Sequence, residues 1–146
     1  MTPLETVQHM YAAFGRGDVP AILACLAEDV QWEYGERGPS PAPVPWLQPR
    51  RGRDAVIGFF EALTALEFSR FVPHRLLDDG PLVVALIDLE ATVRATGRTV
   101  VEDDEVHLWH FDAAGKVCRF RHRADSWAHA VALGAVAGGE PPASAR

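Results

Sequence analysis

The spacing of apolar residues changes along the chain from a helical period to a strand-like one. In the first part, apolar side chains recur every three or four positions, as they do along one face of a helix. This spacing predicts a helix over residues 4–14 and a second helix that starts at the N-cap Asp18 and carries Leu26 on its apolar side. A further apolar stripe predicts a third helix over residues 54–66.

The rest of the chain alternates apolar and polar side chains, which is the pattern of strands that are buried on one face. Pro73 predicts that its strand lies at a sheet edge or contains a bulge. Five prolines between residues 35 and 49 predict a flap without a regular element. The predicted strands cover residues 30–34, 68–77, 82–95, 99–111 and 116–124, and a short final helix covers residues 126–133. Helices segregated to one face of such a sheet predict an α+β fold with a cavity between the layers.

Length, charge and hydropathy indicate the number of domains and argue against some classes of partner. The 146 residues fit one domain, which we expect over residues 1–134, followed by a flexible tail over 135–146. The net charge of −6 and the lack of a basic stretch give no support for a nucleic acid partner. No run approaches the ~18 apolar residues of a membrane span, and the N-terminus lacks the features of a signal peptide. These observations predict a cytoplasmic protein with no membrane partner.

The chain also carries a series of short segments in a characteristic order. They are Tyr11-Ala-Ala-Phe14, Leu26-Ala-Glu-Asp29-Val-Gln-Trp32, Gly52-Arg53-Asp54-Ala55-Val56, Ala95-Thr96-Gly97-Arg98 and Val106-His107-Leu108-Trp109-His110-Phe111. Together they resemble the SnoaL-like branch of the nuclear-transport-factor-2-like (NTF2-like) superfamily. The resemblance implies a cone with three N-terminal helices packed on a curved mixed or antiparallel sheet, a short C-terminal helix, a homodimer formed through the sheet, and an apolar pocket. Members include isomerases, polyketide cyclases, epoxide hydrolases and non-catalytic binders, so the family alone does not define the chemistry.

The resemblance sets one face of the strand over residues 99–111 against the pocket. Strand alternation puts Asp103, Glu105, His107, Trp109 and Phe111 on that face, and Glu102, Asp104, Val106, Leu108 and His110 on the other. His107 then falls about where the related ketosteroid isomerases keep a proton-donating acid. With Glu105 two residues away on the same face, His107 is a candidate catalytic acid or base. The alternative is a neutral histidine that is hydrogen-bonded to its surroundings.

Asp125 is the second candidate catalytic residue. In the SnoaL-like cyclases and in the epoxide hydrolases of the superfamily, an aspartate at a similar place does acid–base work. The alternative is that Asp125 caps the final helix. Neither known catalytic pattern is complete, because Asp88 and Glu90 stand where the epoxide hydrolases would have an arginine and an aspartate, and the general base of the ketosteroid isomerases falls near Tyr34.

Aromatic and titratable side chains complete the predicted pocket. The residues predicted to bind a ligand are Tyr11, Trp32, Tyr34, Trp46, Phe59, Glu105, Trp109, Phe120 and His122. They favour a small hydrophobic molecule (polyketide-, steroid- or terpenoid-like) that proton transfer would isomerise or cyclise. The alternative is a non-catalytic ligand-binding or dimeric scaffold domain. No cofactor and no metal are predicted, because His107 and His110 point to opposite strand faces, although His122 and His74 could approach His107 across the sheet.

Overall fold

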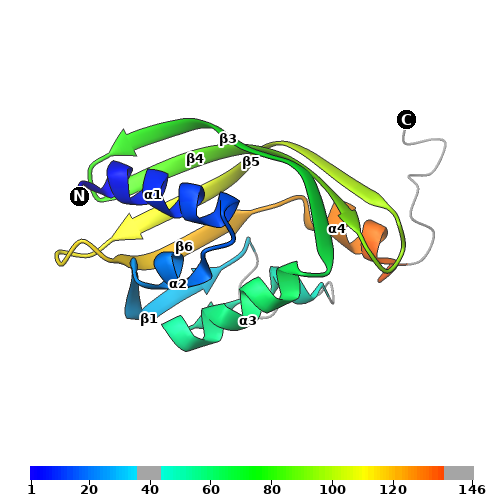
Figure 1. Ribbon diagram of the computed structural model, residues 1–146, viewed down its shortest axis with the longest axis horizontal. Coiled ribbons are helices and arrows are strands. Elements are labelled where there is room, and N and C mark those ends of the chain that lie inside the picture. Colours follow the sequence, from blue (N-terminus) through cyan, green and yellow to red (C-terminus); the bar gives the residue numbers. More distant parts are fainter. Residues whose placement is uncertain (36–43, 137–146) are drawn as a thin grey trace.

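The computed structural model describes residues 1–35 and 44–136, which form a strongly curved sheet with helices packed against it (Figure 1). The helices are α1 (Pro3–Gly15), α2 (Val19–Leu23), the short 3-10 helix η1 (Pro45–Leu47), α3 (Arg53–Leu63) and α4 (Ser126–Leu133). The strands are β1 (Leu26–Glu33), β2 (Arg50–Arg51), β3 (Leu66–Asp79), β4 (Leu82–Val93), β5 (Thr99–Phe111) and β6 (Val117–Arg123). Among the described residues, no helix is both long and apolar enough to cross a membrane.

The six strands form one mixed sheet in the order β2-β1-β6-β5-β4-β3. The long strands β3, β4, β5 and β6 pair antiparallel in sequence order, whereas β1 runs parallel to β6. Figure 1 shows α1 lying along the long strands, α3 crossing on the same side of the sheet, and α4 at one end. The predicted α+β class with a short C-terminal helix is confirmed, and the sheet is mixed.

Strand β3 forms one edge of the sheet, and Pro73 lies beside a shift in its pairing with β4. Both expectations for Pro73 are therefore confirmed, because a residue without a backbone N–H is tolerated at an edge and at a bulge. The outer face of the strands includes partly exposed apolar side chains such as Val72 and Leu77. The homodimer through the sheet stays a prediction.

Two apolar residues that were predicted to lie on helices begin strands instead. Leu26 starts β1 and pairs with Val117 of β6, after α2 has ended at Leu23. Leu66 starts β3 and pairs with Val93 of β4. Both leucines are buried, so each satisfies the spacing of the helix before it, while its backbone pairs with a neighbouring strand. Apolar spacing cannot separate the two assignments at the end of an element.

The proline-rich segment and the two residues after it contain regular elements that the composition did not predict. Pro45–Leu47 is the 3-10 helix η1, and Arg50–Arg51 pairs with β1 as the strand β2. The side chains of Val44, Trp46 and Leu47 are buried, and their packing stabilises a turn of helix that needs few hydrogen bonds. Residues 36–43 of the predicted flap lie outside the described residues, as do residues 137–146 of the predicted tail.

A bulge in β5 changes which of its residues face the interior. Ile87 of β4 pairs with Glu105, but Leu89 pairs with Glu102, so β5 holds one more residue than β4 over this interval. Asp104 lies in the bulge with a φ of 60°, a conformation that residues other than glycine rarely adopt. The prediction that Glu102 faces outward is wrong: its side chain is buried, with 6% exposed. Strict alternation failed because it assumes an unbroken strand ladder.

Candidate active site

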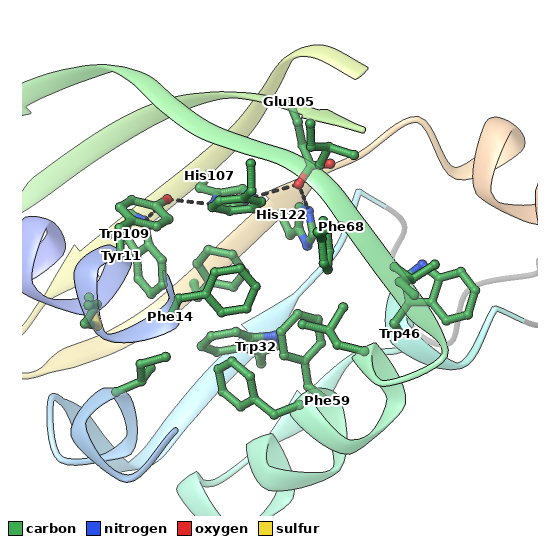
Figure 2. Close-up of a pocket in the computed structure, with 18 of the residues that line it drawn as sticks. Tyr11, Phe14, Trp32, Trp46, Phe59, Phe68, Glu105, His107, Trp109 and His122 are labelled. Atoms are coloured by element: carbon green, nitrogen blue, oxygen red, sulfur yellow. Dashed lines mark hydrogen bonds and ion pairs between the residues drawn. The ribbon is translucent and has the colours of Figure 1, made fainter. Parts of the chain in front are cut away.

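A cavity lies between the helices and the sheet (Figure 2). Its walls are almost entirely apolar, and no lysine or arginine is among the described residues that line it. The lining residues are Met10, Tyr11, Phe14, Ile22, Trp32, Trp46, Phe59, Phe60, Leu63, Leu66, Phe68, Phe71, Leu89, Glu105, His107, Trp109, Phe120, His122 and His129.

Most residues that were predicted to meet a ligand line this cavity. They are Tyr11, Trp32, Trp46, Phe59, Glu105, Trp109, Phe120 and His122, together with the candidate catalytic residue His107. Three further lining residues, Phe14, Phe68 and Phe71, were not predicted to meet a ligand, and their ring centres lie within 6.0 Å of one another. Phe14 lies on the apolar stripe of the first predicted helix, and this position was the signal in the sequence that it faces the interior. Phe68 and Phe71 are separated by a shift in the pairing of β3, so alternation could not place them on one face.

Tyr34 supports the wall from behind and is not among the lining residues. Its hydroxyl donates a hydrogen bond of 2.8 Å to the backbone carbonyl oxygen of Trp46. Its ring packs against the imidazole of His122 at 5.1 Å between ring centres. Tyr34 therefore joins the Trp46 segment to β6.

A chain of hydrogen bonds runs along the wall that β5 forms. The indole N–H of Trp109 lies 2.9 Å from the hydroxyl oxygen of Tyr11, and that oxygen lies 2.6 Å from Nδ1 of His107. Nε2 of His107 lies 2.8 Å from Oε1 of Glu105. Because an indole can only donate, the Tyr11 oxygen accepts from Trp109 and has its own hydrogen left for His107. His107 is then neutral, with its hydrogen on Nε2, and donates to the Glu105 carboxylate.

The pKa values agree with hydrogen bonds donated from Trp109 to Tyr11, from Tyr11 to His107 and from His107 to Glu105. Burial lowers the pKa of His107 to about 4, although the hydrogen bond to Glu105 opposes the shift, so the imidazole is neutral at neutral pH. Burial also raises the pKa of Tyr11 well above its ordinary value, which keeps the hydroxyl protonated. For Glu105, burial would raise the pKa, but the charge of His122 and the imidazole donors outweigh it and hold the pKa well below its usual range.

His122 completes this group from the neighbouring strand. It pairs directly with His107 across β5 and β6, and its Nε2 makes a very short contact with the same Oε1 of Glu105. The expected approach of His122 to His107 is thus confirmed. His74 instead lies outside the cavity, where its Nε2 is 2.6 Å from Asp104. The ligating atoms of Glu105, His107 and His122 lie within 4.8 Å of one another, but both imidazoles point at one carboxylate oxygen as donors, so these contacts are satisfied without an ion.

A second polar cluster adjoins the first and was missed from the sequence. Oε2 of Glu102 lies 2.8 Å from Nε2 of His129, whose Nδ1 lies 2.9 Å from the indole nitrogen of Trp46. The indole donates, so Nδ1 of His129 accepts, and His129 offers its Nε2 hydrogen to Glu102. Burial raises the pKa of Glu102 to about 7. The cluster could not be predicted, because the bulge reversed the face of Glu102 and His129 lies on α4, far along the chain.

The structure places Asp125 at the start of α4, where its carboxylate accepts a hydrogen bond of 3.0 Å from the backbone N–H of Ala128. Its own backbone N–H donates to Oε1 of Glu102 at 2.5 Å. Asp125 is not among the cavity-lining residues. Its catalytic role stays a prediction, and this geometry favours the helix cap.

Replacing Asp125 with alanine should lower the free energy of unfolding by about 1 kcal/mol, as the loss of an N-cap usually does. Asp125→Ser is the matched control, because serine also caps helices but carries no carboxylate. Urea unfolding followed by circular dichroism measures both. If the serine variant loses as much stability as the alanine variant, the carboxylate acts as more than a cap.

Comparison with known proteins agrees with this architecture. The family model described as the SnoaL-like domain matches residues 7–120. An NTF2-like protein from Burkholderia thailandensis E264 is 27% identical, with 91% of this chain and 98% of that chain covered and a TM-score of 0.78. An NTF2-like protein of unknown function from Burkholderia pseudomallei K96243 is 29% identical, with 85% and 91% covered and a TM-score of 0.73.

A third similar structure was obtained with a small molecule. It is that of TerC co-crystallised with polyporic acid, at 24% identity, with 90% of this chain and 98% of that chain covered and a TM-score of 0.74. No curated protein matches the sequence. The family match covers most of the chain, including the helices and strands that build the cavity. The chain therefore belongs to the SnoaL-like domain family, within the NTF2-like fold.

Proposed function

We propose that this protein binds a small, neutral, apolar molecule in its aromatic cavity and catalyses proton transfer within it, as an isomerase or a cyclase would. The observation that carries the proposal is the hydrogen-bonded series Trp109–Tyr11–His107–Glu105, which runs along the cavity wall. Polar groups that are aligned in a dry, apolar site are suited to move a proton to or from a bound ligand.

In this proposal Tyr11, and not His107, is the group that meets the ligand. Both nitrogens of His107 already have partners, Tyr11 on one side and Glu105 on the other. A proton taken from the ligand would therefore reach the Tyr11 oxygen as Tyr11 passes its own proton to Nδ1 of His107. The resulting imidazolium is stabilised by the Glu105 carboxylate. The reverse movement returns the proton to another atom of the ligand, so the reaction needs no cofactor.

The cavity also indicates the kind of ligand. Its aromatic walls favour a flat, ring-containing skeleton of the polyketide, steroid or terpenoid type. The absence of lysine and arginine from the described lining disfavours an anionic ligand, because the carboxylate of Glu105 would repel it and no cation would compensate. That TerC was crystallised with polyporic acid is compatible with a small-molecule ligand in this fold.

Solvent-deuterium exchange tests the proposal, because it detects proton transfer whatever product is formed. Polycyclic ketones with an exchangeable C–H next to the carbonyl are incubated with the protein in deuterated buffer, and NMR measures deuterium uptake at that carbon. Binding is followed separately by tryptophan fluorescence, since Trp32 and Trp109 line the cavity. We expect the wild-type protein to accelerate uptake for ligands that bind.

Glu105→Gln should lower this exchange rate about 100-fold, because an amide cannot stabilise the imidazolium as a carboxylate does. Glu33→Gln is the matched control: it removes the same charge from a residue that pairs with Arg119, on the strand face opposite Trp32. If ligands bind but neither the wild-type protein nor the control accelerates exchange, the catalytic proposal fails, and non-catalytic ligand binding is the function that remains.

A further inference from the structure

The bulge in β5 brings a second carboxyl group next to Glu105. The side chain of Glu102 is 6% exposed and that of Glu105 is 2% exposed. Their carboxylate oxygens and a ring nitrogen of His129 lie within 4.8 Å of one another. Two carboxylates at this separation, away from water, repel each other strongly when both are ionised. The more favourable state of the pair holds one proton.

The surroundings decide which of the two carries that proton. Oε1 of Glu105 is in hydrogen-bonding contact with Nε2 of His107 and with Nε2 of His122. The charge of His122 and these two hydrogen bonds lower the pKa of Glu105. Glu102 accepts a hydrogen bond from Nε2 of His129. Nδ1 of His129 accepts a hydrogen bond from the indole of Trp46, so it carries no hydrogen and this imidazole is neutral. The stronger positive field therefore lies at Glu105, and the proton belongs to Glu102.

Glu105 has a further feature that fits a protonated neighbour. Its second oxygen, Oε2, is buried and has no hydrogen-bond partner among the described residues. Buried carboxylate oxygens without a donor are costly and uncommon. A protonated Glu102 carries an O–H that could supply the missing donor.

The bulge that creates this pair is held from outside the cavity. The backbone N–H of Asp104 donates to Oδ1 of Asp88 at 3.1 Å, and the carboxylate of Asp104 lies 2.6 Å from Nε2 of His74. Arg70 lies 3.5 Å from Asp88. A left-handed conformation at a residue with a side chain costs on the order of 1 kcal/mol. These surface contacts stabilise that conformation, and the consequence is a glutamate turned inward.

We propose that Glu102 and Glu105 hold a single proton between them at neutral pH, and that Glu102 thereby sets the proton affinity of Glu105 behind the Tyr11–His107 pair. Glu102 is a positioning residue in this scheme, since it acts through Glu105. With one proton the pair carries one negative charge, and it becomes neutral if the Nε2 proton of His107 moves to Glu105. The proton returns by the same path, so no other reactant is required. The shared proton is independent of the proposed function, whereas its use in catalysis rests on it.

The titratable groups around Glu102 come from three elements. Glu105 and, further along, His107 lie on β5; His122 lies on β6; His129 lies on α4, and Asp125 caps that helix. A measurement must therefore report on the two carboxyl groups themselves.

Carbon-13 labelling of the glutamate carboxyl groups in the full chain provides that measurement. NMR follows the Cδ shifts of Glu102 and Glu105 between pH 4 and 9. We expect Glu102 to titrate near pH 7, with a smaller step at the same pH in the signal of Glu105. In Glu105→Gln, the midpoint for Glu102 should move toward ordinary glutamate values of about 4.3, because the charge that repels its ionisation is gone.

Glu90→Gln is the control, because Glu90 is exposed on β4 and its replacement should leave both signals unchanged. If Glu105→Gln does not fold, the wild-type titration still decides the matter. The proposal of a shared proton is overturned if the Glu102 signal titrates near pH 4. It is also overturned if the Glu105 signal shows no step at the pH where Glu102 titrates. If the titration shows a shared proton but the protein does not accelerate deuterium exchange, the proposal of the carboxyl pair stands and only its role in catalysis fails.

Discussion

Replacing Tyr11 with phenylalanine should abolish most of the proton transfer, with deuterium uptake by a bound ketone falling about 100-fold or more. In the proposed transfer, the Tyr11 hydroxyl passes its proton to His107, and the same oxygen, which also accepts a hydrogen bond from Trp109, takes the proton of the ligand. Loss of a positioned acid–base group usually lowers a rate between about 10² and 10⁴-fold. The variant keeps the aromatic ring and loses only the hydroxyl, so ligand affinity, measured by tryptophan fluorescence, should change little.

The matched control for this experiment is Tyr34→Phe. Tyr34 is also a buried tyrosine, but its hydroxyl is bonded to the carbonyl oxygen of Trp46, away from the residues that line the cavity. Tyr11→Phe leaves two buried partners unsatisfied, Nε1 of Trp109 and Nδ1 of His107, and Tyr34→Phe leaves one, the carbonyl oxygen of Trp46. Both variants should therefore lose stability, by about 1–3 kcal/mol for each partner. Only the Tyr11 variant should lose exchange. Equal losses of exchange in both would mean that packing, and not the Tyr11 hydroxyl, controls the reaction.

The apolar part of the site could be predicted from the sequence, because it follows from periods that strands and helices impose. Trp109 and His107 share a face of β5 with Glu105 because their spacing is two, and no bulge separates them. Trp32 lies on β1 and reaches the same cavity by the same alternation. Aromatic residues at such positions line either a core or a cavity wall, so the prediction needed little tertiary information.

The polar contacts could not be predicted, because they join elements that are distant in sequence. The bond between Tyr11 and His107 spans 96 residues and depends on how α1 lies across β5. Glu102 escaped detection because one extra residue in the strand reverses every side chain beyond it. The available signal was the run of consecutive acidic residues from Glu102 to Glu105. An aspartate within it tolerates a left-handed backbone better than most residues.

Glu102→Gln should change how stability depends on pH. Burial raises the pKa of Glu102 to about 7 in the folded protein, whereas the ordinary glutamate pKa in the unfolded chain is about 4.3. The contribution of Glu102 is therefore fully present below about pH 4.3 and is lost as the pH rises through 7. That loss corresponds to about 4 kcal/mol, and glutamine cannot ionise, so the variant should not suffer it.

Urea unfolding of the wild-type protein and of Glu102→Gln at several pH values between 5 and 8.5 measures this difference. The stability of the variant relative to wild type should rise by about 2–3 kcal/mol in total, mostly between pH 5 and about 7, and level off at higher pH, where Glu102 is ionised in both the folded and the unfolded state. His107 has a lowered pKa of about 4, so its effect has the opposite sign: the protein loses stability as the pH falls below about 6.5. This effect is present in both proteins and cancels from the comparison. Glu90→Gln should show a constant offset instead. A difference between wild type and Glu102→Gln that stays constant with pH would mean that Glu102 is already ionised in the folded protein at pH 5, and that no carboxyl pair shares a proton in this site.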